Sequence, residues 1–331
     1  MAGFDDIIGQ ESIVNHMKNA IKLKKISHAY IINGESGMGK KTLARAFAMT
    51  LQCEKKGITP CMECHSCKQC LTNNQPDIKW ITHEKPSTIS VDDIREQINS
   101  DILIKPYSSE YKIYIMDEAE KMNVAAQNAL LKTIEEPPSY GILMLLVNNK
   151  DSFLQTILSR CVALDMKPLS NDLIIDYMKR NLKLPDYQAA LMANFAAGNL
   201  GRGIRLASSE NFLQIKDCAL NHMKGIGNAT ADKVASYAKE LSGFKDNVLE
   251  YLDLLTSWFR DVLIYKASRD ANELIFKEEI SLIEQFSIKI SYNGLSEIFE
   301  NIGKVNTRLK ANVNFELTFT LLFMSIRDNF Q

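Results

Sequence analysis

The sequence predicts a fold in two parts: an α/β region built on a parallel sheet, then a region that contains only helices. Three observations support this prediction. Apolar runs typical of buried strands alternate with helical patterns over roughly the first half of the chain. A glycine-rich loop joins the first such strand to a helix. Beyond Leu169, helical periodicity continues without another strand.

Length and composition indicate a globular protein with two or three domains. The chain has 331 residues, 46% of them hydrophobic, and a formal net charge of -1. This balance gives no overall attraction to nucleic acid, so a DNA contact must be local or made by another subunit. No apolar run approaches about 18 residues, and the acidic residues 1–6 lack the features of a signal peptide. We therefore expect a cytosolic protein.

The glycine-rich loop, GESGMGKKT, occupies residues 34–42. It follows an apolar run at 29–32 and opens a predicted helix at 42–52, which is the setting of a phosphate-binding loop. Its glycines let the backbone curl, so that N–H groups, the helix start and the Lys40 ammonium face one anionic group. The loop therefore predicts a nucleotide site.

One position departs from the G-x-x-x-x-G-K-[ST] pattern. Lys41 stands where a hydroxyl normally binds magnesium, and Thr42 comes one residue later, about 100° further around the helix. We therefore expect weak binding of Mg-ATP and negligible hydrolysis.

A second apolar run, at 111–116, ends in Asp117 and Glu118. Downstream of a phosphate loop, Asp117 is expected to hold magnesium or its water, and Glu118 to orient or deprotonate the attacking water. With Lys41 in place, both roles are in doubt.

A third strand, at 142–147, ends at Asn148, and an Ala- and Leu-rich helix at 123–136 precedes it. Because parallel strands end at one edge of the sheet, Asn148 could touch a terminal phosphate or water. The candidate nucleotide-binding residues are Gly34, Gly37, Gly39, Lys40, Lys41, Thr42 and Asn148.

Five of the seven cysteines lie within residues 53–70. In a cytosolic chain such crowding indicates a metal site rather than disulfides. We expect a structural Zn²⁺, because four thiolates leave no open position. The expected ligands are Cys53, Cys61, Cys64 and Cys67, with Cys70 as an alternative to Cys53. An iron–sulfur cluster, which is less favoured, and unliganded thiols are the other interpretations.

Further helices are predicted from periodicity and caps. Helical segments are predicted at 13–21, 173–178, 189–197 and 252–263, and a capped helix start at 89–94. Asn314 is predicted to cap a last helix that runs to about Arg327. Residues 198–203 are predicted as a break between helices.

Together, these segments resemble bacterial clamp-loader subunits of the AAA+ class over essentially the whole chain. The matching segments, in order, are residues 4–10, 28–30, the glycine-rich loop, the cysteine group, 117–120, 130–138, Ser159-Arg160-Cys161 and 308–314.

The resemblance implies an AAA+ P-loop domain at 1–165 with a zinc knuckle at 53–70, a helical lid at 166–208 and an all-α collar at 209–331. It implies that Arg160 serves in trans, as an arginine finger for a neighbouring motor subunit. The implied partners are the gamma/tau and delta subunits, and, through the complex, the sliding clamp and primed DNA.

Two branches of this family fit. We favour the delta-prime branch over the gamma/tau motor branch, because Lys41 replaces the motor's Thr and Gly201 stands where motors carry an arginine. The length and residues 255–263 agree with that choice. The chain contains no polymerase site. The alternatives are an active motor subunit, another AAA+ remodeller such as a homohexameric branch-migration helicase, and an interaction module with a vestigial pocket.

Overall fold

The computed structural model describes residues 3–83, 88–209, 211–311 and 313–330. The chain divides into two compact units. Unit 1 comprises Met1–Tyr177 with Ala197–Gly201, and unit 2 comprises Met178–Ala196 with Arg202–Gln331. The finer division into three domains, at 165 and 208, stays a prediction.

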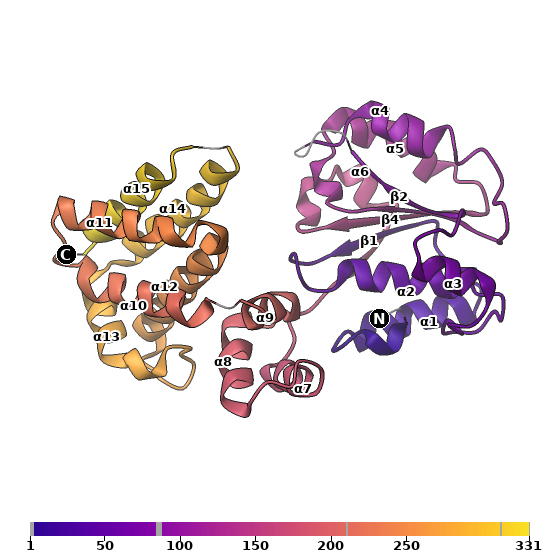
Figure 1. Ribbon diagram of the computed structural model, residues 1–331. Helices are drawn as coiled ribbons and strands as arrows, with labels where there is room; N and C mark the ends of the chain where they lie inside the picture. The colour runs from indigo at the N-terminus through magenta and orange to yellow at the C-terminus, as the bar shows by residue number, and fades with distance from the viewer. Residues whose placement is uncertain (1–2, 84–87, 210, 312, 331) are drawn as a thin grey trace. The chain divides into compact units, whose positions relative to one another are not determined.

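Unit 1 contains a five-stranded parallel sheet in the order β2-β3-β4-β1-β5, which confirms the predicted α/β fold (Figure 1). The strands are β1 (Ala29–Asn33), β2 (Ile78–Ile81), β3 (Lys112–Met116), β4 (Gly141–Val147) and β5 (Val162–Asp165). The sequence predicted only the three central strands. The outer strands β2 and β5 are short and half-exposed, so they lack the continuous apolar run of a strand covered on both faces.

Helices cover both faces of this sheet (Figure 1). Successive residues of β1 point to opposite faces, so Ala29 and Ile31 join one core while Tyr30 and Ile32 join the other. The first core includes residues from α4 (Val91–Ile94), α5 (Val124–Glu135) and α6 (Gln155–Leu158). The second includes residues from α1 (Glu11–Lys22) and α2 (Lys40–Gln52).

Local sequence features place the helix starts. The Asn123 side chain accepts from the Ala126 N–H at 2.8 Å and caps α5, and Ser90 caps α4 in the same way. Helix α2 begins at Lys40, two residues earlier than predicted, so both Lys40 and Lys41 lie in its first turn. The short helix α3 (His65–Leu71) lies in the cysteine-rich segment.

The remaining elements are helices, as predicted. They are α7 (Asn171–Asn181), α8 (Asp186–Ala196), α9 (Leu200–Ala207), α10 (Phe212–Ile226), α11 (Ala231–Leu241), α12 (Val248–Ser268), α13 (Ile280–Lys289), α14 (Tyr292–Lys310) and α15 (Phe315–Asp328). The predicted break at 198–203 was too long, because α9 already begins at Leu200.

Aromatic side chains are a part of the core of unit 2. Trp258 and Phe259 of α12 pack against Phe286 of α13. The predicted cap of the last helix is confirmed, since Asn314 Oδ1 accepts from the Leu317 N–H at 2.9 Å. Among the described helices, none has the length and apolar character that crossing a membrane requires.

Candidate functional site

The predicted phosphate-binding loop connects β1 to α2 at the carboxyl edge of the sheet. Gly37 and Gly39 have φ values of 95° and 99°, which side chains with a Cβ rarely adopt. These two glycines let the chain turn sharply into the start of α2. The predicted loop geometry is therefore present.

Lys40 lies inside this loop and is 7% exposed. Its ammonium donates to the carbonyl oxygens of Gly34 and Glu35, at 3.1 Å to Glu35, and to Asn148 Oδ1 at 2.8 Å. Burial lowers the pKa of Lys40, while the carboxylates of Glu120 and its neighbours oppose that shift. The structure thus brings together Gly34, Lys40 and Asn148 from two strand ends.

The neighbouring Lys41 reaches the second predicted strand end. Its ammonium lies 2.7 Å from Asp117 Oδ2. Asp117 is the carboxylate expected to hold magnesium. The Lys41 ammonium therefore lies beside Asp117, where the magnesium ion was expected. Thr42, the displaced hydroxyl of the motif, follows in the first turn of α2 and is half-buried.

Two more acidic residues stand beside the pocket. Glu118 has a left-handed φ of 50° and pairs with Lys121. Glu120 accepts from the Asn148 side-chain amide, and its second carboxylate oxygen is buried without a hydrogen-bond partner among the described residues. Glu120 had no predicted role, although it stands in the same acidic stretch as Asp117.

A segment distant in sequence packs on the loop. The Gly201 N–H donates to the Gly37 carbonyl at 3.0 Å, and the Asn199 side chain donates to the Ser36 carbonyl at 2.9 Å. A Cβ on Gly201 would lie 2.5 Å from the Gly37 oxygen and 2.7 Å from its Cα. Only glycine allows this approach. Gly201 and Asn199 both lie in the predicted break at 198–203, but no short sequence pattern indicates their contacts with the loop.

Arg160 lies in the turn after α6, with 41% of its side chain exposed. Its guanidinium pairs with Glu135 Oε1 at 3.0 Å and donates to the Thr156 carbonyl at 3.0 Å. It is therefore a surface residue of unit 1, oriented by one carboxylate and one carbonyl.

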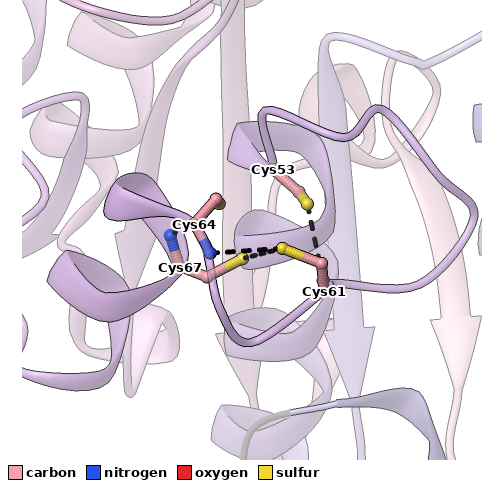
Figure 2. Close-up of side chains that lie close together, drawn as sticks. All are labelled: Cys53, Cys61, Cys64 and Cys67. Atoms are coloured by element: carbon pink, nitrogen blue, oxygen red, sulfur yellow. Dashed lines mark hydrogen bonds between the residues drawn. The ribbon is translucent and has the colours of Figure 1, made fainter.

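The cysteine group forms a compact cluster (Figure 2). The sulfur atoms of Cys53, Cys61, Cys64 and Cys67 all lie within 4.8 Å of one another, and Cys70 is not among them. Cys53 follows the end of α2, and Cys64 caps α3. The structure thus gathers the four cysteines that the sequence analysis preferred.

Backbone N–H groups point at these sulfurs. The N–H groups of Cys61, Cys64 and Cys67 donate to the sulfurs of Cys53, Cys61 and Cys64 respectively, each at 3.4 Å. Such bonds from Cys64 and Glu63 lower the pKa of Cys61 to about 6, whereas burial raises the pKa of Cys67. Four sulfur donors at these separations suit the tetrahedral coordination of Zn²⁺.

Comparison with known proteins identifies the family. The protein-family model described as "DNA polymerase III, delta subunit" matches residues 9–170. A second family model, described as "DNA polymerase III, delta subunit, C terminal", matches residues 219–328. DNA polymerase III subunit gamma of Buchnera aphidicola (strain Sg) is 30% identical to this chain. That match covers 92% of this chain and 86% of the relative. The chain belongs to the family of DNA polymerase III clamp-loader subunits.

Both branches occur among the relatives of this clamp-loader subunit. Subunit delta' of Bacillus subtilis is 27% identical, with 93% of each chain covered. Subunit tau of the same organism is 29% identical over 93% of this chain, but this chain spans only 58% of tau. A gamma subunit-related protein from Thermotoga maritima aligns in structure over 96% of this chain and 99% of its own, at 20% identity with a TM-score of 0.45.

Proposed function

We propose that this chain is the delta-prime-type subunit of a bacterial DNA polymerase III clamp loader. In this role it supports ATP-dependent loading of the sliding clamp on primed DNA, gives Arg160 to the ATP site of a neighbouring gamma/tau motor subunit, and hydrolyses little or no ATP itself. The observation that carries the choice of branch is the ion pair between Lys41 and Asp117.

This ion pair opposes catalysis in the chain's own pocket. Magnesium in such a loop is shared between a hydroxyl and the acidic residue at the end of the strand. Here an ammonium replaces the hydroxyl and pairs with Asp117, so Mg²⁺ must displace it and then lacks one ligand. We infer that Mg-ATP binds weakly and turns over negligibly.

The Gly201 contact supports the same conclusion. In motor subunits, the resemblance places an arginine at this position. Here the backbone of Gly201 packs against Gly37 too closely for any side chain. The chain therefore offers no arginine from that position to a phosphate in its own loop.

Arg160 remains available for a neighbour. Its partner Glu135 is 47% exposed, and ion pairs this exposed contribute only about 0–1 kcal/mol. A guanidinium held so weakly can leave Glu135 for a phosphate that binds it in two places. In a neighbouring site it would neutralise charge that develops during phosphoryl transfer.

The active motor branch is the second candidate. Lys40, Asp117, Glu118 and Asn148 all stand at the pocket, and gamma and tau subunits are among the relatives. Hydrolysis by the isolated chain, abolished by Lys40→Ala, would establish this function. A homohexameric remodeller is less favoured because of the cysteine cluster, and native mass distinguishes it. An interaction module with a vestigial pocket differs from our proposal only in whether Arg160 matters.

We also propose the cofactors, the partners and the cellular location of this chain. Cys53, Cys61, Cys64 and Cys67 would hold a structural Zn²⁺, while ATP with Mg²⁺ would be at most a weak ligand. The partners would be the gamma/tau and delta subunits, with the clamp and primed DNA engaged through the complex. A replication protein of bacteria works in the cytoplasm, which is where we place this chain.

The test is reconstitution of the loader from this chain with the delta and gamma/tau subunits of the same organism. We expect Arg160→Ala to leave assembly intact and to slow ATP turnover at the neighbouring site by about 10³. Arg95→Ala, which removes another exposed arginine of unit 1, is the matched control. Unchanged clamp-stimulated turnover in the Arg160→Ala complex would rule out the proposed role.

A further inference from the structure

Unit 2 contains a second cluster of metal-ligating side chains, which the proposed function does not use. Cys218 and His222 lie one turn apart on α10, and Glu240 lies near the end of α11. Their ligand atoms all lie within 4.8 Å of one another. Thiolate, imidazole and carboxylate are the three donor types that bind zinc.

The separations fit one tetrahedral ion. Cys218 Sγ lies 3.6 Å from His222 Nε2, which lies 3.3 Å from Glu240 Oε2, and Cys218 Sγ lies 4.0 Å from Glu240 Oε1. Zinc bonds of about 2.3 Å to sulfur and about 2.0–2.1 Å to nitrogen or oxygen require ligand separations of roughly 3.3–3.6 Å. Two of the three distances meet that range. The Glu240 distances are to different oxygens, so a rotation of the carboxylate is needed to bring one oxygen within reach of both partners.

A neighbouring hydroxyl orients the imidazole of His222 for metal binding. His222 Nδ1 lies 2.7 Å from the hydroxyl of Tyr251, a fully buried residue of α12. A hydrogen bond at the second ring nitrogen is the usual support of a metal-ligating histidine.

We propose that Cys218, His222 and Glu240 form a second zinc-type site, which binds Zn²⁺ or a similar borderline cation such as Co²⁺. Mg²⁺ and Ca²⁺ are poor candidates because they prefer oxygen ligands. Cys218 and His222 are buried while the Glu240 side chain is 57% exposed, so a water molecule can take the fourth position on that side. The ion would fasten α10 to α11, with Tyr251 of α12 behind it.

A hydrogen-bonded histidine is the competing explanation. His222 could bridge Tyr251 and Glu240 through its two nitrogens without any ion. That arrangement satisfies the imidazole and predicts no metal uptake by unit 2. The two explanations therefore differ in a quantity that can be measured directly.

The experiment counts metal in the full chain after removal by chelation and refilling with Zn²⁺ or Co²⁺. A Cys61→Ser, Cys64→Ser double variant removes the first cluster, so that the second can be titrated alone. In this background we expect about one equivalent of Co²⁺, with a sulfur-to-cobalt charge-transfer band whose intensity corresponds to one thiolate.

Glu240→Gln is the principal variant, because an exposed side chain can be changed without disturbing the core. It should weaken Co²⁺ binding at least tenfold, because even the loss of an outer-shell partner of a ligand costs about 10–100-fold in metal affinity. Cys218→Ser should abolish the charge-transfer band. Glu284→Gln, on the exposed surface of α13, is the control and should change neither the Co²⁺ affinity nor the charge-transfer band. The proposal is overturned if the folded double variant binds no Co²⁺, or binds it equally well with Gln at position 240.

Discussion

The Lys41 ammonium lies 2.7 Å from the Asp117 carboxylate, where a nucleotide-hydrolysing loop would share a magnesium ion. In the function proposed here, this one residue in the first turn of α2 opposes metal binding at the end of β3. This relationship depends on the parallel sheet, since both residues follow strands whose carboxyl ends lie at one edge.

Lys41→Thr should restore the missing hydroxyl and free Asp117. We expect its affinity for Mg-ATP to rise by about tenfold, equivalent to ~1.4 kcal/mol. The affinity is measured by binding of a fluorescent nucleotide with and without EDTA, because only the affinity of the variant should depend on Mg²⁺. Thr42→Ala, at the next residue, should change neither the nucleotide affinity nor its dependence on Mg²⁺. Equal, magnesium-dependent affinity in the native chain would contradict the prediction.

Gly201→Ala should destabilise unit 1. The new Cβ would stand 2.5 Å from the Gly37 carbonyl oxygen, so the backbone must move, at a cost of about 1–3 kcal/mol. Gly303→Ala is a matched control, because a Cβ there meets nothing within 4 Å and alanine favours the helix. Urea unfolding of both variants provides the comparison. If Gly201→Ala is as stable as the native chain, the contact with the loop is not close in solution.

Removing a ligand of the first cysteine cluster should lower the zinc content by about one equivalent. We expect this for Cys53→Ser and Cys64→Ser, whereas Cys70→Ser should keep its zinc because Cys70 stands outside the cluster. Elemental analysis of the purified proteins gives the answer. Loss of zinc in Cys70→Ser alone would assign the fourth ligand to Cys70, and iron in place of zinc would indicate a cluster of another kind.

Asp101 should make stability depend on acid pH. Burial raises its pKa, but hydrogen bonds from Lys112, Lys79 and Tyr114 outweigh that effect and lower it to about 2. Because the folded-state pKa is depressed, the stabilisation is complete above about pH 4 and is lost as the pH falls through 2. Asp101→Asn should therefore cost roughly 2 kcal/mol at neutral pH and much less near pH 2.

Unfolding by urea at several pH values measures this dependence. Asp5→Asn is the control, because Asp5 is 91% exposed and lies 3.9 Å from its partner Lys18. A cost for Asp101→Asn that stays constant down to pH 2 would show that the carboxylate is not held in this way.

The amino-acid sequence by itself determined the elements whose causes are local. The central strands β1, β3 and β4 are apolar because both their faces are covered, and their residues alone reveal them. The glycines of the loop, the cap at Asn314 and the crowded cysteines depend on neighbours a few residues away. The resemblance to clamp-loader subunits arose from such motifs in their order along the chain.

Only the tertiary structure decided which distant residues meet. Lys41 with Asp117, Gly201 with Gly37, and His222 with Glu240 each join parts of the chain that no short pattern connects. Strand order and helix packing bring them together, and these depend on burial summed over the whole unit. The outer strands β2 and β5 belong to the same class, because pairing with β3 and β1 makes them strands, while their own half-exposed residues do not.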